Sequence, residues 1–131
     1  MRWGLEIAAG AWLLAAGAMT ATAALAPAGD AARGAKVYAA NCGSCHSLDA
    51  NRVGPAHRGV YGRKVGTARG FAYSPAMRGA RIVWNAATLD RFLQNPQAMV
   101  PGTRMGFRLA DPVRRADVIA YLRQQSQPPR K

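Results

Sequence analysis

Five consecutive residues, Cys-Gly-Ser-Cys-His at positions 42–46, constrain this chain more than any other feature. Cys42 and Cys45 are its only cysteines, and His46 follows the second one directly. This spacing is typical of covalent attachment of a c-type haem, in which each thiol adds to one vinyl group of the porphyrin. One helical turn can present both sulfur atoms to the same edge of the ring and bring the imidazole of His46 within reach of the iron. The motif therefore predicts a fold built around one haem.

Other uses of two nearby cysteines fit this sequence less well. A zinc site needs four ligands, and only His46 and His57 could add to the cysteines. A thioredoxin-like redox pair is expected beside a βαβ unit, whereas no strand-like run flanks this motif. A disulfide across two intervening residues would be strained.

Residues 1–28 have the features of a secretion signal. An uncharged segment at positions 7–19 is followed by small residues, and cleavage is expected after Ala26 or Ala28. The alternative is an uncleaved membrane anchor, because the 20 residues of 7–26 could just cross the bilayer at ~1.5 Å per residue. Export fits the haem motif, since c-type attachment takes place outside the cytoplasm in bacteria. We therefore expect a periplasmic protein with one domain at positions 29–131.

Positive charge dominates the composition, with 18 Lys and Arg against 6 Asp and Glu and a formal net charge of +12. Residues 29–131 keep this charge, because the first 28 residues contain one basic and one acidic side chain. Such a charge accelerates association with acidic partners in a salt-dependent way. Nucleic acid is the alternative partner, but the basic residues are scattered and no nucleic-acid motif accompanies them, so we expect none.

Helix signals divide the domain into short segments. N-cap residues predict helix starts immediately after Asp30, Ser74, Asn85 and Asp111. The first helix is expected over 31–42, and Asn95-Pro96 should end the third. Positions 48–69 are rich in Gly, Pro and Arg without a steady period, which favours a long loop wrapped around a cofactor. The expected fold class is all-α, with short helices and long loops around the haem.

The second axial position of the iron decides what such a haem can do. Left open, it would bind peroxide, oxygen or nitric oxide, as in a haem peroxidase or a gas sensor. Filled by a methionine sulfur, it gives an electron carrier with a raised potential. The candidates are Met77, Met99 and Met105. Methionine is often only a core filler. Met105 differs from the other two candidates in its surroundings, because Pro101 stiffens its segment and Gly106 allows the backbone to come close to the plane of a haem.

Further motifs follow one another in a characteristic order: Gly34 and Tyr38 before the haem motif, Val53-Gly54-Pro55, Gly62-Arg63-Lys64, Gly70–Ser74, Trp84, Thr88 to Pro96, Pro101–Met105 with Phe107, and Arg115–Leu122. Together they resemble a class I c-type cytochrome of the mitochondrial and small bacterial kind. The resemblance covers about residues 30–124 and implies the cytochrome c fold.

The resemblance implies a role for each matching residue. The carbonyl of Pro55 would accept a hydrogen bond from the ring of His46. Tyr73 and Trp84 would donate to a buried haem propionate, whose charge Arg63 would offset. The implied iron ligands are His46 and Met105, and the implied haem contacts are Cys42, Cys45, Pro55, Arg63, Tyr73, Trp84 and Phe107.

The chain also departs from the family pattern. Phe92 and Met77 stand where the family often has a tyrosine and an asparagine, which predicts a drier methionine side. Lysines common before the methionine loop are missing, so the docking face should rely on Arg52, Arg104 and Arg108. His57 replaces an apolar residue beside Pro55, and we expect it to be a surface or packing histidine.

The expected function is one-electron transfer by a soluble, monomeric, exported cytochrome c that is not an enzyme. Its partners would be oxidases, reductases or dehydrogenases with acidic docking faces, together with transient contact with a membrane surface. One rival is a dedicated cytochrome subunit of a periplasmic dehydrogenase complex. The other is the haem peroxidase or gas sensor with an open sixth position.

Overall fold

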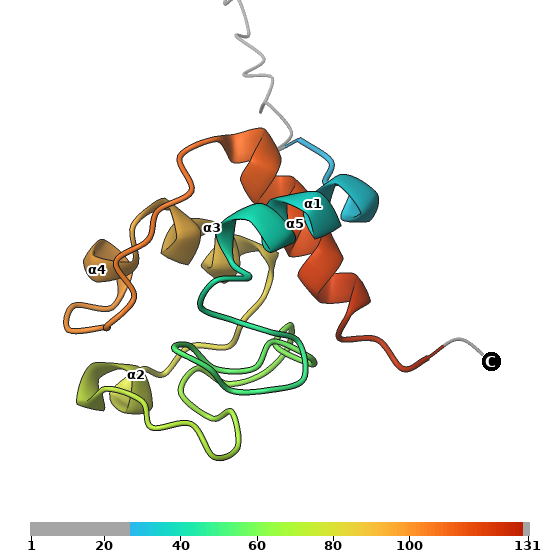
Figure 1. The fold of residues 1–131 in the computed structure, drawn as a ribbon. Coiled ribbons are helices and arrows are strands. Elements are labelled where there is room, and N and C mark those ends of the chain that lie inside the picture. The colour runs from blue at the N-terminus through green and yellow to red at the C-terminus, as the bar shows by residue number, and fades with distance from the viewer. Residues whose placement is uncertain (1–26, 130–131) are drawn as a thin grey trace, which may run out of the picture.

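A computed structural model describes residues 27–129 of the chain. The described part contains the helices α1 (Ala31–Asn41), α2 (Pro75–Gly79), α3 (Ala86–Gln94), α4 (Pro96–Met99) and α5 (Pro112–Gln124) (Figure 1). No strand forms between residues 27 and 129, where a single antiparallel bridge joins Lys64 to Val83. The all-α prediction is confirmed. The expected leader lies outside the described residues, except for positions 27 and 28.

The predicted helix starts are confirmed, because a side-chain oxygen of each capping residue accepts from a backbone N–H in the first turn. Such a cap satisfies one of the N–H groups that a helix start leaves unpaired. The cap of α3 is reciprocal, since the Thr88 hydroxyl also accepts from the backbone N–H of Asn85. The helix α4 was not predicted. Asn95 ends α3 and also caps α4 by accepting from the N–H of Ala98.

Helices α1 and α5 cross at close range (Figure 1). A Cβ atom at Gly34 would lie 2.0 Å from the backbone oxygen of Asp117 and 2.8 Å from Cβ of Tyr121, so only glycine permits this approach. The Asp117 carboxylate accepts from the Arg33 guanidinium at 2.8 Å and from the backbone N–H of Asp30 at 2.7 Å. These contacts fix the direction of α1, whose far end leads into the haem motif.

The segment between α1 and α2 is irregular and is held by backbone hydrogen bonds to residues before α3. The N–H of Gly62 donates to the carbonyl of Trp84 at 2.7 Å, and the N–H of Trp84 donates to the carbonyl of Arg63 at 2.9 Å. Gly66 has a φ of +75°, and a Cβ there would lie 2.4 Å from the carbonyl oxygen of Met77. Glycine is required at this position on both grounds.

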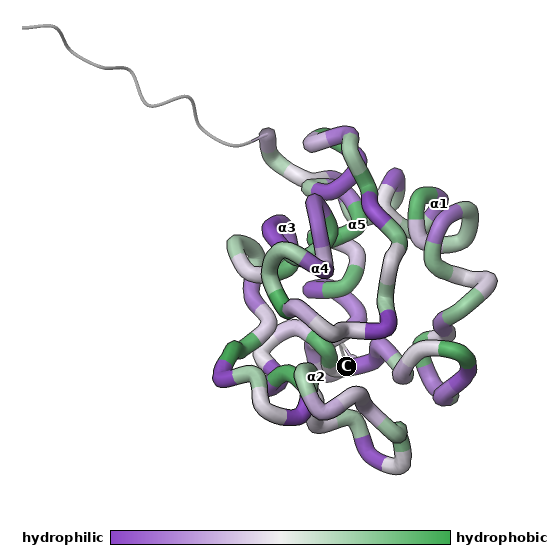
Figure 2. Tube along the Cα trace, turned by 90° about the vertical axis from the view of Figure 1, so that its left-hand side faces the viewer, coloured by the Kyte–Doolittle hydropathy of each residue, from purple (hydrophilic) through white to green (hydrophobic). Residues whose placement is uncertain are grey.

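Hydrophobic and hydrophilic residues alternate over short distances along the trace (Figure 2). Between residues 27 and 129, no helix is long and apolar enough to cross a membrane. Helices this short are unstable alone and depend on tertiary packing. The shared core draws side chains from helices and loops alike: Val37, Tyr38, Val60, Val65, Tyr73, Met77, Trp84, Leu89, Phe92, Leu93, Val100, Leu109, Val118, Ile119 and Leu122.

Candidate haem site

The haem motif continues the last turn of α1. The N–H groups of Cys45 and His46 both donate to the carbonyl of Cys42, at 3.1 and 2.8 Å, so the motif forms a tight turn. Cys42 is half-buried and Cys45 is exposed, and both are free thiols. Burial raises the pKa of Cys42 to about 11, whereas thiols of redox-active pairs have lowered pKa values. Burial therefore keeps the Cys42 thiol protonated at neutral pH, unlike the thiols of a redox-active pair.

The imidazole of His46 is buried and oriented by Pro55. Its Nδ1 lies 2.8 Å from the carbonyl oxygen of Pro55. Because a carbonyl can only accept, Nδ1 carries the proton and Nε2 keeps a free lone pair. Burial lowers the pKa of His46, and the hydrogen bond to Pro55 partly opposes this shift. The structure thus favours the neutral imidazole, which is the form that ligates a metal.

The backbone of Gly54 lies directly against the ring of His46. A Cβ atom at Gly54 would lie 2.1 Å from Cε1 and within 2.6 Å of both ring nitrogens. The N–H of Gly54 donates to the carbonyl of Cys45 at 2.8 Å, which holds the two segments together. The sequence singled out Gly54 only as part of a matching loop, and its contact with His46 is visible only in the structure.

His57 stacks on His46, with 4.0 Å between the ring centroids and 19° between the ring planes. Its Nδ1 lies 3.1 Å from the hydroxyl of Tyr38 on α1. Burial lowers the pKa of His57 to about 3, and burial also raises the pKa of Tyr38, so both groups are uncharged at neutral pH. Of the two roles expected for His57, the structure shows packing, against the predicted iron ligand itself.

Two of the expected propionate contacts are buried core residues, and the third has a buried donor without a partner among the described residues. Tyr73 and Trp84 are 7% and 6% exposed, and the backbone N–H of Trp84 donates to the carbonyl of Arg63. The Tyr73 hydroxyl accepts from the N–H of Ala68 at 3.2 Å, which leaves its own proton for another acceptor. The Nε atom of Arg63 is buried and has no partner among the described residues. Leaving such a donor unpaired is costly, and an anionic propionate would satisfy it, so these residues fit a haem.

Met105 lies half-buried in the loop between α4 and α5. Its N–H lies 3.4 Å from the hydroxyl oxygen of Thr103, to which it donates. The side-chain amide of Gln97 donates to the carbonyl of Thr103 at 2.6 Å. The guanidinium of Arg104 donates to the carbonyl of Ala72 at 3.1 Å, which ties the loop to the segment before α2. Side chains therefore hold this loop in place.

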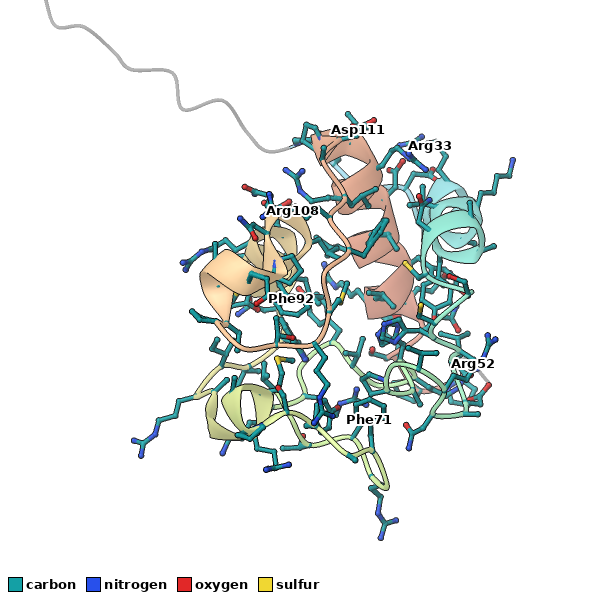
Figure 3. The ribbon with its side chains drawn as sticks, turned by 60° about the vertical axis from the view of Figure 1, so that its left-hand side comes forward. Arg33, Arg52, Phe71, Phe92, Arg108 and Asp111 are labelled. Carbon is teal, nitrogen blue, oxygen red and sulfur yellow. The ribbon has the colours of Figure 1, made fainter. Side chains whose placement is uncertain are left out.

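The other candidate methionines lie in different surroundings. Met99 ends α4 and lines a shallow surface hollow with residues of α3 and α4, and Met77 is buried in α2. Phe92 points from α3 into the interior (Figure 3), where its ring lies 4.9 Å from that of Trp84. Phe107 is 40% exposed, so the described residues do not enclose this expected haem contact.

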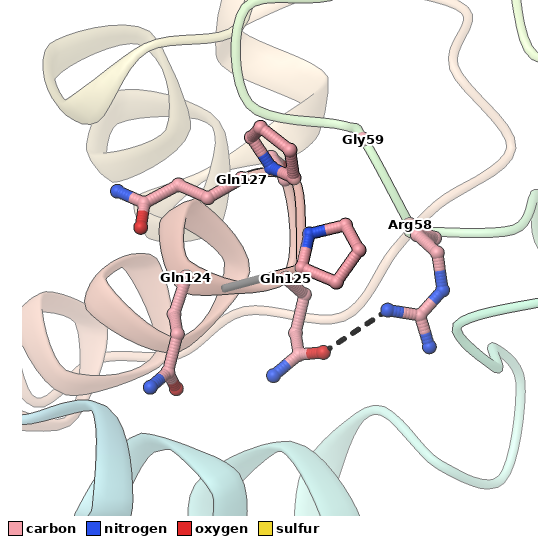
Figure 4. A pocket seen from close by; sticks show the side chains of 8 residues that line it. Arg58, Gly59, Gln124, Gln125 and Gln127 are labelled. Carbon is pink, nitrogen blue, oxygen red and sulfur yellow. Dashed lines mark hydrogen bonds between the residues drawn. The ribbon is translucent and has the colours of Figure 1, made fainter. Parts of the chain in front are cut away.

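Arginine side chains project from many parts of the surface (Figure 3). The guanidinium of Arg52 donates to the carbonyl of Gly43 at 2.6 Å, which places a positive charge beside the haem motif. A hollow next to the carboxyl-terminal segment is separate from this region (Figure 4). It is lined by Arg58, Gly59 and residues 124–129, with Arg58 donating to the side chain of Gln125 at 3.2 Å, and it contains none of the expected haem contacts.

Known proteins similar to this chain are cytochromes c. The family model described as cytochrome c matches residues 31–126. Cytochrome c of Chlamydomonas reinhardtii is 46% identical over 107 residues, covering 79% of this chain and 96% of the relative. Cytochrome c2 of Rhodomicrobium vannielii is 45% identical over 102 residues, covering 75% of this chain and 81% of the relative. The structure of cytochrome cH from Methylobacterium extorquens superposes with a TM-score of 0.70 and 42% identity, over 73% of this chain and 99% of that one.

Proposed function

The chain belongs to the cytochrome c family, and on this premise we propose that His46 and Met105 hold the haem iron between them. Family membership makes the protein a monohaem class I cytochrome c, an electron carrier with one haem c attached through Cys42 and Cys45. The observation that best supports the proposed ligation is the hydrogen bond of His46 to Pro55, because it leaves Nε2 free.

When bound, the haem supplies an iron that cycles between its ferric and ferrous states. His46 provides a neutral imidazole in one tautomer, and Met105 provides a soft thioether that raises the reduction potential. Both residues lie in segments held by hydrogen bonds, so they can stay in place when the iron changes charge. The buried propionate would be held by Arg63, Tyr73 and Trp84, of which Trp84 and Arg63 are joined by a backbone hydrogen bond and Tyr73 and Trp84 are both buried in the core.

The ligation is tested by the weak near-infrared band of a ferric iron–sulfur bond. We expect the wild-type protein to show this band, Met105→Ala to lose it and Met99→Ala to keep it. Loss of the band in Met99→Ala, with retention in Met105→Ala, would contradict the assignment. Met99→Ala is a matched control, because it removes the same side chain a few residues away, from a helix end that lines the outer hollow.

A closed iron would also leave the protein without enzymatic activity. We propose electron transfer without a chemical substrate, because a bound methionine leaves no position for peroxide or a gas. The reduced protein at neutral pH should then fail to bind carbon monoxide. Stoichiometric binding would instead support the haem peroxidase or gas sensor.

We further propose that residues 1–28 direct export to the periplasm and are removed after Ala26 or Ala28. Haem attachment outside the cytoplasm supports this location. Mass spectrometry of the protein from a periplasmic extract should show a chain that begins at position 27 or 29. A full-length chain recovered with the membranes would instead support an uncleaved anchor.

The proposed partners are oxidases, reductases or dehydrogenases with acidic docking faces. The net charge of +12 supports this proposal, because it attracts acidic surfaces. The guanidinium of Arg52 lies beside the haem motif, where such a face would approach the haem edge. Capture of partners by the native haem protein at low salt, and their release at high salt, tests this proposal. A dehydrogenase that stays bound at high salt would favour the rival role of a dedicated subunit.

A further inference from the structure

Three rings from different segments form one assembly on the histidine side of the haem site. His46 ends the haem motif, His57 follows in the loop, and Tyr38 belongs to α1. The rings of His46 and His57 stack at 4.0 Å, and the ring of Tyr38 meets that of His57 edge-on at 5.6 Å. A hydroxyl–imidazole contact of 3.1 Å joins Tyr38 to His57.

The two polar groups of this assembly satisfy each other. The Tyr38 side chain is buried in the core, and His57 is packed between it and His46. The buried hydroxyl of Tyr38 needs a hydrogen-bond partner, and the half-buried imidazole of His57 supplies one. Apolar residues at both positions would fill the same space without this requirement. The pairing therefore sets a definite position for the ring of His57 by a directional contact, which an apolar side chain held by packing alone would lack.

The stack supplies a constraint on His46 that Pro55 cannot supply. The hydrogen bond at Nδ1 and an iron bond at Nε2 both act at the edge of the imidazole, in its plane. Neither contact presses on a face of the ring, which rotation about the iron–Nε2 bond would displace. A second ring lying 19° from parallel against the face of His46 opposes this rotation.

We propose that Tyr38 and His57 are a positioning pair that sets the rotation of the His46 ring relative to the haem. The inference rests on the proposed ligation of the iron by His46. It assigns no bond to the iron and no proton transfer to His57. Tyr38 fixes His57 through the hydroxyl, and His57 fixes His46 through the stacked ring.

The rotation of an axial imidazole has its own spectroscopic signature. In low-spin ferric haem, the orientations of the axial ligands, the plane of the imidazole among them, determine how unpaired spin is shared among the four pyrrole rings. The four haem methyl groups consequently resonate at separate, strongly shifted positions in the proton NMR spectrum. A change in the rotation of His46 therefore alters the order or spread of these signals, whether or not the protein becomes less stable.

The test compares His57→Leu, Tyr38→Phe and the double variant as ferric haem proteins at one neutral pH. His57→Leu should alter the methyl pattern and lower the melting temperature, because it also strands the Tyr38 hydroxyl. Tyr38→Phe should give a smaller change of pattern in the same direction, since the stack remains. The double variant should regain at least half of the lost melting temperature, because both polar partners are gone, and should keep the altered pattern.

Recovery of stability without recovery of the pattern separates positioning from simple packing. A double variant with the wild-type methyl pattern would overturn the proposal. Tyr61→Phe is the matched control, because its hydroxyl is hydrogen bonded to no residue within 27–129, and it should leave the pattern unchanged. An equal change in Tyr61→Phe would also overturn the proposal. Failure of His46 ligation itself would be seen separately, because the wild-type spectrum would then lack the low-spin histidine signature.

Discussion

The two sides of the haem site are held in different ways. On the histidine side, His46 is contacted by the Gly54 backbone, the Pro55 carbonyl and the ring of His57. On the methionine side, Met105 sits in a loop that is held by side chains of Gln97 and Arg104 reaching backbone carbonyls. One proposed ligand is contacted on its ring by backbone and by a second ring, whereas the other is half-buried against the core in a loop that side-chain hydrogen bonds hold.

This difference has an energetic consequence. A ring in van der Waals contact with backbone cannot move unless the backbone moves, and close-packed interiors resist such shifts. A loop held by a few side-chain hydrogen bonds gives way when one of them is lost, each contributing on the order of 1 kcal/mol. We therefore expect the iron–methionine bond to break before the iron–histidine bond under any mild perturbation.

The largest effect is expected from Gly54→Ala, which tests the histidine side directly. The new Cβ would lie 2.1 Å from Cε1 of His46, so the ring or its loop must shift. Overpacking of this kind costs about 3 kcal/mol. Denaturant unfolding of the haem protein, followed by haem absorbance, should show a loss of that size.

Gly79→Ala is the control for this substitution. A Cβ at Gly79 meets no described atom within 4 Å, and its φ is not positive. It should change the free energy of unfolding by less than about 0.5 kcal/mol. If Gly54→Ala were equally harmless, the histidine side would be more adaptable than the contacts of His46 indicate.

A smaller effect is expected from Gln97→Ala, which tests the methionine side. The substitution removes the 2.6 Å hydrogen bond to the carbonyl of Thr103, two residues before Met105. Without this bond, the loop conformation that holds Met105 should be less stable by about 1 kcal/mol. Added imidazole competes with the methionine for the ferric iron, so its affinity should rise roughly fivefold. A spectrophotometric titration with imidazole measures this change.

Gln94→Ala provides the matched control. Its side-chain amide donates to Asp90 on the exposed face of α3, away from the methionine loop. The imidazole affinity of Gln94→Ala should equal that of the wild type. Equal gains in both variants would show that general destabilisation, and not release of the loop, admits the competing ligand.

Local chemistry explains why the helix starts were predictable from the sequence. Asp30, Ser74, Asn85 and Asp111 act within three residues of themselves, and each caps its helix as expected. The haem motif is equally local, since its five residues lie on one turn. The resemblance to the family predicted the order of the segments along the chain, and the structure has the all-α fold that this order implies.

Contacts between loops were not predictable in the same way. The approach of Gly54 to His46 and the stacking of His57 depend on where two irregular segments meet in space. A glycine or histidine in a loop has many possible uses, and no periodicity distinguishes among them. The unpaired Nε of Arg63 is similar, because only burial makes it informative. These residues could be named from the sequence, but the contacts and burial that define their roles could not.

The smallest effect is expected from Asp117→Asn, which loosens the support of the histidine side from farther away. The Arg33 guanidinium, and then the backbone N–H of Asp30, hold the pKa of Asp117 below its ordinary value. A carboxylate with a lowered pKa stabilises the fold above its ordinary pKa, near 4, and this stability is lost as the pH falls through the lowered value. The variant should therefore melt about 2 °C lower at pH 7.

The difference in melting temperature between wild type and Asp117→Asn should shrink as the pH falls through the lowered pKa of the wild-type carboxylate, which then also becomes neutral. Asp111→Asn is the control, since asparagine caps a helix about as well as aspartate, and it should melt like the wild type at pH 7. The crossing of α1 and α5 lies at the other end of α1 from the haem motif, so the near-infrared band of Asp117→Asn should be unchanged at pH 7. Loss of that band would mean that the methionine side depends on the helix crossing, and that the two sides are less independent than their contacts suggest.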